Sequence, residues 1–443
     1  MPSAEPPGRP PDTIAAVATP PGRGAVGIVR VSGPLAPAIA RRVLRHLPQP
    51  RVATLMTARD EQGEALDRGL ALYFPAPHSY TGEHGFEFQG HGGPVVMQSV
   101  LAACVNAGAR LAEPGEFTRR AFLNGRIDLA QAEAVADVID AATQEAARLA
   151  VRSMCGEFSA AIHALVAQLV ELRALTEAML DFPDEEVDSL HRDDAAARLA
   201  GVRAALQDVL SRSRQGSLLR TGIHVVLAGR PNVGKSSLLN RLMGEDRAIV
   251  TPVPGTTRDA LRESIQIEGV PLVVVDTAGL RVPSDPVERL GIERTQIELA
   301  QADLVIAVFE AGVPQASLEA LPEGVARVEV YNKVDLAPDF VPPAGALAVS
   351  AMTGAGMDAL KGRILAEAGW RAAGESVFLA RERHLQALQQ AATHLQAAAD
   401  ELRRWELFAE ELRLAQAALA GITGEVTADD LLGEIFGRFC IGK

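Results

Sequence analysis

The feature that most constrains this chain is a glycine-rich run between an apolar segment and a helical pattern. Residues 229–236 read GRPNVGKS, which matches the phosphate-binding pattern GxxxxGK[ST]. They follow the apolar run Ile223–Ala228 and precede residues 237–243, whose composition is typical of a helix. Glycines let backbone N–H groups point at phosphates, and the start of the next helix adds partial positive charge. This order predicts a parallel α/β sheet that binds nucleotide phosphates.

Two side chains of this loop have the chemistry to contact phosphate and metal. We expect the Lys235 ammonium to reach the β- and γ-phosphates and the Ser236 hydroxyl to bind Mg²⁺. The loop residues predicted to bind nucleotide are Asn232, Val233, Gly234, Lys235, Ser236 and Ser237.

Three later motifs, each after an apolar run, indicate that the nucleotide is GTP. Residues 276–279 read DTAG, residues 332–335 read NKVD, and Ser350 and Ala351 follow the last run. The Asp335 carboxylate can accept the two N–H groups that guanine presents and adenine lacks. Such motifs belong at the carboxyl ends of parallel strands. They add the predicted GTP-binding residues Asp276, Thr277, Ala278, Gly279, Asn332, Lys333, Asp335, Ser350 and Ala351.

The position after Gly279 bears on how water is activated. It is Leu280, whereas a glutamine often orients the attacking water in such proteins. Acidic candidates just downstream are Asp285 and Glu288. Arg258 could act as an arginine finger, but its neighbour Asp259 favours a local structural pair.

The rest of the chain divides into segments that differ in their amino-acid pattern. Residues 1–11 are a proline-rich start, and residues 12–124 hold short apolar runs broken by glycine and proline, which predicts a small α+β domain. Residues 125–216 and 375–443 share an Ala/Leu-rich helical pattern on either side of the alternating segment 217–374. We therefore expect a multidomain α/β plus α protein, with a helical domain split by an inserted Ras-like P-loop GTPase domain.

Composition excludes several classes of protein. The formal net charge of −13 argues against a chain that grips nucleic acid over a large surface by itself, although a local basic patch or a basic partner would fit. Cys104, Cys155 and Cys440 are far apart, which excludes a disulfide framework and a cysteine-rich zinc site and fits a reducing compartment. We find no signal peptide and no apolar run of about 18 residues, so we expect a cytoplasmic protein with no membrane span.

Several motifs together resemble the MnmE (TrmE) family of tRNA-modification GTPases, which are TrmE–Era-type GTPases. Those within the GTPase segment are residues 229–240 and 248–259. Those outside it are ATPPGRG at 18–24, QGHGG at 89–93, PGEF at 114–117, AFLN at 121–124 and FCIGK at 439–443.

This resemblance implies a biochemical role. It implies a homodimer that modifies the wobble uridine of certain tRNAs to an aminomethyl or carboxymethylaminomethyl derivative. A flavin-dependent partner, MnmG (GidA), would form a hetero-oligomer with it and carry FAD. The N-terminal domain would bind a one-carbon tetrahydrofolate.

The resemblance also assigns metal and catalytic residues. Asn232 would coordinate K⁺, and a monovalent cation there can supply the positive charge of an arginine finger. Thr257 would join Ser236 on Mg²⁺, and Glu288 matches the acid that orients water, so it acts with Lys235 in catalysis. The loop 248–259 would contribute oxygens to K⁺ from Thr251, Val253 and Thr256, and its GTP-binding residues would be Thr251, Thr256 and Thr257.

For the folate, the matching positions are Arg30, Glu87 and Arg126, with Lys443 near by. A carboxylate suits the paired N–H donors of a pterin, and cations suit the glutamate tail. The alternative for Arg30 and Glu87 is a structural ion pair. His91 fits a turn or packing role as well as a ligand role, and Cys440 fits a structural or substrate-site thiol better than a nucleophile or a prenylated cysteine.

Two other classes of GTPase share the central module. A ribosome-assembly GTPase of the Era type would need a basic RNA-binding appendage, and a membrane-remodelling GTPase would need a basic amphipathic helix. Neither segment is evident in the sequence.

Overall fold

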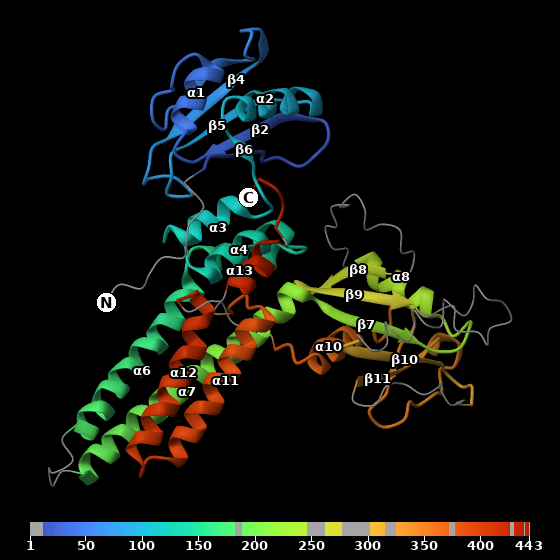
Figure 1. Cartoon of the computed structure of the whole chain (residues 1–443). Helices are drawn as coiled ribbons and strands as arrows, with labels where there is room; N and C mark the ends of the chain where they lie inside the picture. The colour runs from blue at the N-terminus through green and yellow to red at the C-terminus, as the bar shows by residue number, and fades with distance from the viewer. Residues whose placement is uncertain are drawn as a thin grey trace, which may run out of the picture. The chain divides into compact units, whose positions relative to one another are not determined.

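The computed structural model of the chain describes residues 12–181, 188–245, 262–276, 302–314, 325–371, 377–425, 429–437 and 439–442. Contacts between residues divide it into two compact units (Figure 1). The first comprises residues 1–136 and 423–443, and the second comprises residues 137–422.

A mixed sheet forms the centre of the first unit. Among the described residues six strands take the order β3–β4–β5–β2–β1–β6. Side chains alternate between the two faces of each strand, so Val29, Val31, Phe86 and Phe88 are buried on the face that packs against α1 and α2. Arg30 and Glu87 therefore lie on the opposite face. The elements are β1 (Ile14–Val17), β2 (Gly24–Ser32), α1 (Ala36–Leu44), β3 (Thr54–Arg59), β4 (Ala65–Phe74), β5 (Gly85–Gly92), α2 (Pro94–Asn106) and β6 (Arg110–Leu111).

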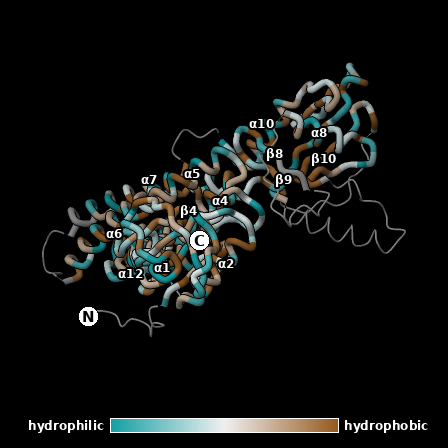
Figure 2. Tube along the Cα trace, turned by 90° about the horizontal axis from the view of Figure 1, so that it is seen from above, coloured by the Kyte–Doolittle hydropathy of each residue, from teal (hydrophilic) through white to brown (hydrophobic). Residues whose placement is uncertain are grey.

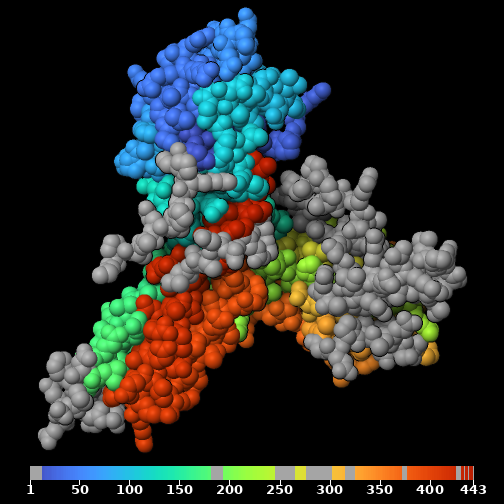
Figure 3. Space-filling view, viewed as in Figure 1, coloured from blue at the N-terminus to red at the C-terminus, as the bar shows by residue number. Residues whose placement is uncertain are grey.

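Three helices and the C-terminal tail complete this unit. They are α3 (Glu116–Leu123), the first part of α4 (Leu129–Asp140) and α13 (Asp429–Gly437). Leu129, Phe436 and Phe439 share one small core, and Ile441 forms an isolated β-bridge with Pro114. The C-terminal segment therefore packs against residues 114–129, as the red residues against cyan ones show in Figure 3.

The second unit contains a bundle of long helices. They are α5 (Gln144–Met154), α6 (Glu157–Asp181), α7 (Asp188–Thr221), α11 (Glu382–Asp400) and α12 (Trp405–Thr423). α7 packs against both α6 and α11. α6 buries Phe158, Ile162, Leu165, Leu169 and Leu172, a stripe at helical spacing. Figure 2 shows apolar (brown) and polar (teal) stretches interspersed in the region of α6, α7 and α12.

α6 also bears on the expectation that no segment spans a membrane. Of the described helices it is the one that is long and apolar enough to cross by length and composition alone. A core helix of a soluble protein passes the same test. Its apolar stripe packs within the bundle, and Arg173 on α6 donates to Gln416 on α12 over 2.7 Å.

The inserted module follows α7 directly and is built on a second sheet. Six strands of its described part take the order β12–β11–β10–β7–β9–β8. β7 pairs in parallel with both β9 and β10, and β8 pairs antiparallel with β9. Its elements are β7 (Ile223–Ala228), α8 (Lys235–Glu245), β8 (Arg262–Ile267), β9 (Val270–Asp276), β10 (Leu304–Glu310), β11 (Ala326–Asn332), η1 (Val334–Leu336), β12 (Leu347–Ala348) and α10 (Met357–Glu367).

One carboxylate contacts both segments that connect this module to the helical domain. Asp137 on α4, with a side chain only 9% exposed, pairs with Arg381 over 2.8 Å and lies 3.9 Å from Arg220. Arg220 stands at the end of α7 just before β7, and Arg381 stands just before α11. Because both linkers meet one buried group, the module is anchored to the helical domain at two points.

The predicted fold class is confirmed: a small α+β domain and a split helical domain with an inserted doubly wound sheet. The domain boundaries expected from the sequence stay predictions. Sequence patterns missed β3, β6 and β8. All three lie at sheet edges, where polar residues such as Arg262 and Glu263 weaken the apolar signal of a strand.

Candidate nucleotide and cofactor sites

The register of the parallel strands gathers the nucleotide motifs at one edge of the second sheet. Leu227 of β7 lies opposite Asp276 of β9, and Ala228 lies opposite Ala307 of β10. Glu310, at the end of β10, lies opposite Asn332 of β11. The order reverses on either side of β7, so the loop after β7 stands at the switch point where ligands bind in such sheets.

The glycine-rich loop closes around its own lysine. The Lys235 ammonium donates to the carbonyl oxygens of Gly229 over 2.8 Å and Arg230 over 3.2 Å. Only 6% of Lys235 is exposed. Ser236 and Ser237 follow in the first turn of α8, which begins at Lys235. The loop thus presents a cation, hydroxyls and a helix N-terminus together, which is the set that polyphosphate binding requires.

Asn332 connects three of the motifs. Its side-chain N–H group donates to the Val233 carbonyl over 3.0 Å, and its side-chain oxygen accepts the Ala351 backbone N–H over 3.0 Å. An amide can do both because it carries a donor and an acceptor. Gly234, at φ 94°, leaves the space: a Cβ there would lie 2.3 Å from the Asn332 amide nitrogen. The sequence placed Asn332 at the nucleotide but did not reveal that it joins the loops.

Asp335, the residue predicted to bind guanine, is also held in place by a hydrogen bond. The buried Ser350 hydroxyl donates to one carboxylate oxygen of Asp335 over 2.5 Å, and the Thr353 N–H donates to the Ser350 hydroxyl over 3.1 Å. Lys333, in the left-handed region at φ 65°, pairs with Glu310 over 2.9 Å. This arrangement orients Asp335 for a base with two adjacent N–H donors.

Several predicted site residues lie outside the part of the chain that the structure describes. Of Asp276 the structure describes only the backbone. The predicted K⁺ set and the water-orienting role therefore stay predictions, except that Asn232 lies in the loop at φ 67°. The residues outside the described ranges are Thr251, Val253, Thr256, Thr257, Thr277, Ala278, Gly279, Glu288 and Lys443.

The first unit holds the second predicted site. Arg30 on β2 and Glu87 on β5 are direct cross-strand neighbours, and Arg30 Nε donates to Glu87 Oε1 over 2.8 Å. Their side chains are 29% and 17% exposed, so both can be reached from outside. The ion pair that the sequence left as the alternative is present. A second Arg30 nitrogen donates to the Gly442 carbonyl over 3.3 Å, which places the C-terminal tail at this pair.

Aromatic rings flank the arginine. The Arg30 guanidinium lies 5.9 Å from the centre of the Tyr80 ring and 5.7 Å from that of Phe117, within the range of cation–π attraction. These residues line a pocket of about 100 Å³. Ligand pockets usually measure about 300–1,000 Å³, so this one encloses only part of a cofactor. Phe117 belongs to the PGEF motif, but no sequence signal singled out Tyr80.

The loop that carries Tyr80 reaches the third predicted folate residue. Arg126 is exposed, and its side-chain carbons lie 3.3–3.4 Å from where a Cβ on Gly82 would be. Asn124 donates to the Thr81 carbonyl over 2.7 Å. Arg30, Glu87 and Arg126 therefore all border this loop, a juxtaposition that the sequence predicted only through family resemblance.

An ion-pair network fixes the same loop. Arg120 pairs with Glu83 of the loop over 3.1 Å, with Glu116 over 2.9 Å and with Asp12 over 2.6 Å. Burial by itself would raise the pKa of Glu116, but hydrogen bonds from Arg110, the Glu113 N–H and Arg120 outweigh it and lower that pKa. The network is therefore ionised at neutral pH and ties the loop to α3.

The structure also describes His91 and Cys440, two further residues that were considered from the sequence. The Asp67 carboxylate accepts the His91 N–H over 2.7 Å and contacts the ring Nδ1 over 2.8 Å, which fits the turn role of His91. Cys440 is exposed. Within the described ranges, no group of three or more His, Cys, Asp or Glu residues could hold a metal ion.

Comparisons with known proteins cover almost the whole chain. A family model described as GTP-binding protein TrmE N-terminus matches residues 13–126, and one described as MnmE helical domain matches residues 129–440. The tRNA modification GTPase MnmE of Azoarcus sp. (strain BH72) is 60% identical over 446 residues, spanning 98% of this chain and 99% of that protein. That of Thiobacillus denitrificans (strain ATCC 25259 / T1) is 59% identical, spanning 98% of each.

One solved structure is a more distant match. The G domain of the T. maritima FeoB iron transporter aligns with 33% of this chain and 98% of its own length at 24% identity. Its TM-score is 0.25, which is too low to support a structural assignment.

Proposed function

The chain belongs to the MnmE family of tRNA modification GTPases, and from that premise we propose that it hydrolyses GTP to drive modification of the wobble uridine of tRNA. The observation that carries this proposal is the guanine side of the nucleotide site. Asn332 joins the phosphate loop to Ala351, and Ser350 orients Asp335. Together with the family assignment, this favours GTP as the nucleotide and tRNA as the substrate.

The nucleotide site supports a division of roles. Lys235 binds the phosphates, and Ser236 with Thr257 would hold Mg²⁺, which would supply positive charge against the phosphates. Ser236 at the start of α8 fits a hard cation, because its hydroxyl stands beside the phosphate loop. Glu288 orients the attacking water, because the position that often holds a glutamine for this role is Leu280 here.

A monovalent cation completes the charge at this site. Asn232, together with oxygens of Thr251, Val253 and Thr256, would hold K⁺, whose charge would replace that of an arginine finger. GTP turnover measured in K⁺ and in Na⁺ tests this assignment. Equal rates in the two salts would refute it.

The first unit binds a reduced folate in this proposal. A one-carbon tetrahydrofolate supplies the carbon of the aminomethyl group when bound. Glu87 pairs with the N–H donors of the pterin, while Arg126 and Lys443 attract its glutamate tail. Tyr80 and Phe117 provide apolar surface beside Arg30, which suits a flat ring. The observed Arg30–Glu87 pair must share or release the carboxylate when the ligand binds.

Partners complete the reaction. We propose that the chain acts as a homodimer in the cytoplasm, in a hetero-oligomer with the flavoprotein MnmG, which carries FAD. The flavin chemistry belongs to that partner, while this chain supplies GTP hydrolysis and the one-carbon unit.

Nucleoside analysis of tRNA tests the proposed function. Cells that lack this protein should lose the aminomethyl-type wobble uridine, and the intact gene should restore it. A gene encoding Asp335→Asn should not restore it at cellular GTP concentrations. An unchanged wobble uridine in cells without the protein would show that the proposed function is wrong.

A further inference from the structure

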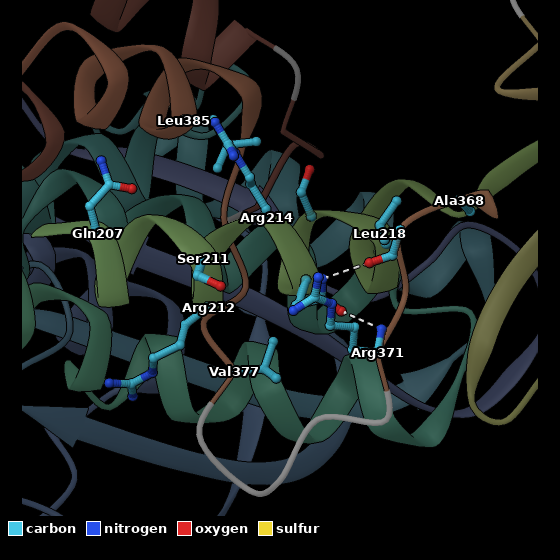
Figure 4. A pocket seen from close by; sticks show the side chains of 12 residues that line it. Gln207, Ser211, Arg212, Arg214, Leu218, Ala368, Arg371, Val377 and Leu385 are labelled. Atoms are coloured by element: carbon cyan, nitrogen blue, oxygen red, sulfur yellow. Dashed lines mark hydrogen bonds between the residues drawn. The ribbon is translucent and has the colours of Figure 1, made fainter. Parts of the chain in front are cut away.

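Two adjoining pockets follow the line where α7 and α11 pack in the second unit. One of about 510 Å³ is lined from α7 by Arg203 and Gln207 and from α11 by Gln389 and Gln396. The other, of about 750 Å³, is lined by Gln207, Arg214 and Arg371 among others (Figure 4). Gln207 lines both, so they form one hollow, which we name the α7–α11 groove.

The charge of this groove is opposite to that of the protein. The whole chain carries a formal charge of −13, yet residues 200–217 of α7, which line the groove, hold three arginines against one aspartate. The facing part of α11, residues 383–399, holds one arginine and no acidic residue. The linings of the two pockets contain no aspartate or glutamate. A basic stripe along a helix in an acidic chain is the electrostatic footprint expected of a polyanion site.

Two arginines of the groove are held by neutral partners. Arg203 donates to the side-chain oxygen of Gln396, and Arg214 donates to that of Gln389 over 2.9 Å. No carboxylate in the described part of the chain pairs with either of them. A glutamine oxygen fixes the direction of a guanidinium but leaves its charge uncancelled. Both charges are therefore available to an external anion.

Other arginines on the same helix are neutralised. Arg198 pairs with Asp194 over 2.9 Å, and Arg212 pairs with Asp208 over 3.1 Å. Arg212 lines the larger pocket, but its guanidinium also lies 3.9 Å over the ring of Phe378. Figure 4 shows its side chain on the other side of α7 from Gln207 and Arg214. These residues contribute no free charge to the groove.

The spacing of the groove residues suits an extended ligand. Arg203, Gln207, Ser211 and Arg214 recur at intervals of three and four residues, so they share one face of α7. The two arginines are eleven positions apart on the helix, which corresponds to a rise of about 16 Å. Arg371 lies beyond Arg214, where Gln215 accepts the Arg371 backbone N–H over 3.0 Å.

We propose that the α7–α11 groove binds the phosphodiester backbone of the tRNA substrate. This inference rests on the proposed function, which makes tRNA the substrate. Arginine, glutamine, serine and threonine side chains are those that contact phosphate and sugar oxygens in nucleic-acid complexes. The groove positions the RNA without reading its sequence, because phosphate contacts carry no base information.

Salt dependence of tRNA binding tests the groove. A tRNA transcript is titrated onto the full-length protein at several KCl concentrations. The double variant Arg203→Gln with Arg214→Gln should weaken binding at low salt by roughly 10-fold and reduce the slope of log affinity against log salt by about two, since two phosphate contacts are lost. The matched Arg-to-Lys double variant should keep the slope.

A second variant cancels one charge without removing the arginine. Gln389→Glu turns the neutral partner of Arg214 into a carboxylate, so it should reduce the slope by about one. Arg198→Gln is the control, because Arg198 already pairs with Asp194 outside the groove, and it should bind tRNA as the parent does. Thermal unfolding compares the folding of all variants.

The outcomes separate this inference from the proposed function. Salt-independent tRNA binding by the parent, or equal slopes for parent and double variant, would overturn the proposal that the groove binds tRNA. The same holds if the double variant keeps tRNA but loses an acidic competitor such as polyglutamate. In each of these cases, a normal wobble-uridine profile in cells carrying the intact gene leaves the proposed function standing.

Discussion

The phosphate loop and the Arg30 pocket differ in how far apart along the chain their residues lie. In the loop, residues 229–236 are consecutive and their backbone provides most of the site. In the pocket, Arg30 meets Glu87 at 57 residues of separation and the Gly442 carbonyl at 412. A site made by one backbone turn leaves a pattern in the sequence, whereas a site made by side chains of distant elements does not.

The two sites also differ in how they are held rigid. Asn332 bridges two loops of the nucleotide site with neutral hydrogen bonds. The pocket depends on charged groups, from Arg30 and Glu87 to the network around Arg120. The pocket should therefore respond to changes of pH, whereas the Asn332 bridge of the nucleotide site should not.

The largest effect is expected at the guanine ligand. Asp335→Asn should lower GTP affinity by roughly 10,000-fold and improve binding of xanthosine triphosphate, because an amide cannot accept both guanine N–H groups. Competition binding of the two nucleotides measures the exchange. Asp339→Asn, a nearby aspartate outside the NKVD motif, is the control. Unchanged GTP affinity in Asp335→Asn would remove the guanine assignment.

A smaller effect is expected at the catalytic acid. Glu288→Ala should leave GTP binding nearly intact and slow turnover by roughly 10- to 1,000-fold, the range for losing a water-positioning group. Single-turnover hydrolysis with and without Asp285→Ala identifies which acid acts. If Glu288→Ala turns over normally and Asp285→Ala does not, the role belongs to Asp285.

The pocket should respond to loss of one charge. Glu87→Gln keeps the shape of the side chain and should weaken binding of a formyl- or methylene-tetrahydrofolate by roughly 10- to 100-fold, because a charge-assisted hydrogen bond is lost. Calorimetry on the full chain measures this, with the exposed Glu64→Gln as control. Folate affinity that survives Glu87→Gln would leave the Arg30–Glu87 pair as a structural ion pair.

The tail provides a second way to test the same pocket. Gly442 has φ 97°, and a Cβ there would lie 2.6 Å from the Val17 carbonyl oxygen. Gly442→Ala should displace the tail from Arg30 and weaken folate binding, by less than Glu87→Gln does. Equal folate affinity for parent and variant would show that the tail does not contribute to folate binding.

The smallest effect is expected in the ion-pair network. The pKa of Glu116 is lowered from its ordinary value of 4.5, so the carboxylate stabilises the fold above that pH and loses its effect as pH falls through the folded pKa. Glu116→Gln should lower Tm at pH 7 by a few degrees, at about 2–4 °C per kcal/mol lost. The difference from the parent should shrink toward pH 3. Glu61→Gln, from the exposed pair with Arg42, is the control and should change little.

Much of the nucleotide site could be predicted from the sequence. The strand before the loop, Ile223–Ala228, matches the predicted run, and α8 begins at Lys235 as the motif requires. The bridging role of Asn332 and the hydroxyl of Ser350 on Asp335 could not be predicted, because they depend on loops that follow different strands. In the pocket, Tyr80 carried no signal, because a single aromatic residue in a loop has no period or spacing to mark it.

The sequence by itself determined the nucleotide motifs, the insertion of an α/β module into a helical domain and the family. These depend on local patterns, since strands, helices and glycine turns each follow from the residues within them. Only the tertiary structure decided that Gly442 reaches Arg30, that Asp137 holds both linkers of the module, and that two arginines on α7 face neutral glutamines on α11. Each of these joins elements distant in sequence, and their positions are set by packing, which no local pattern encodes.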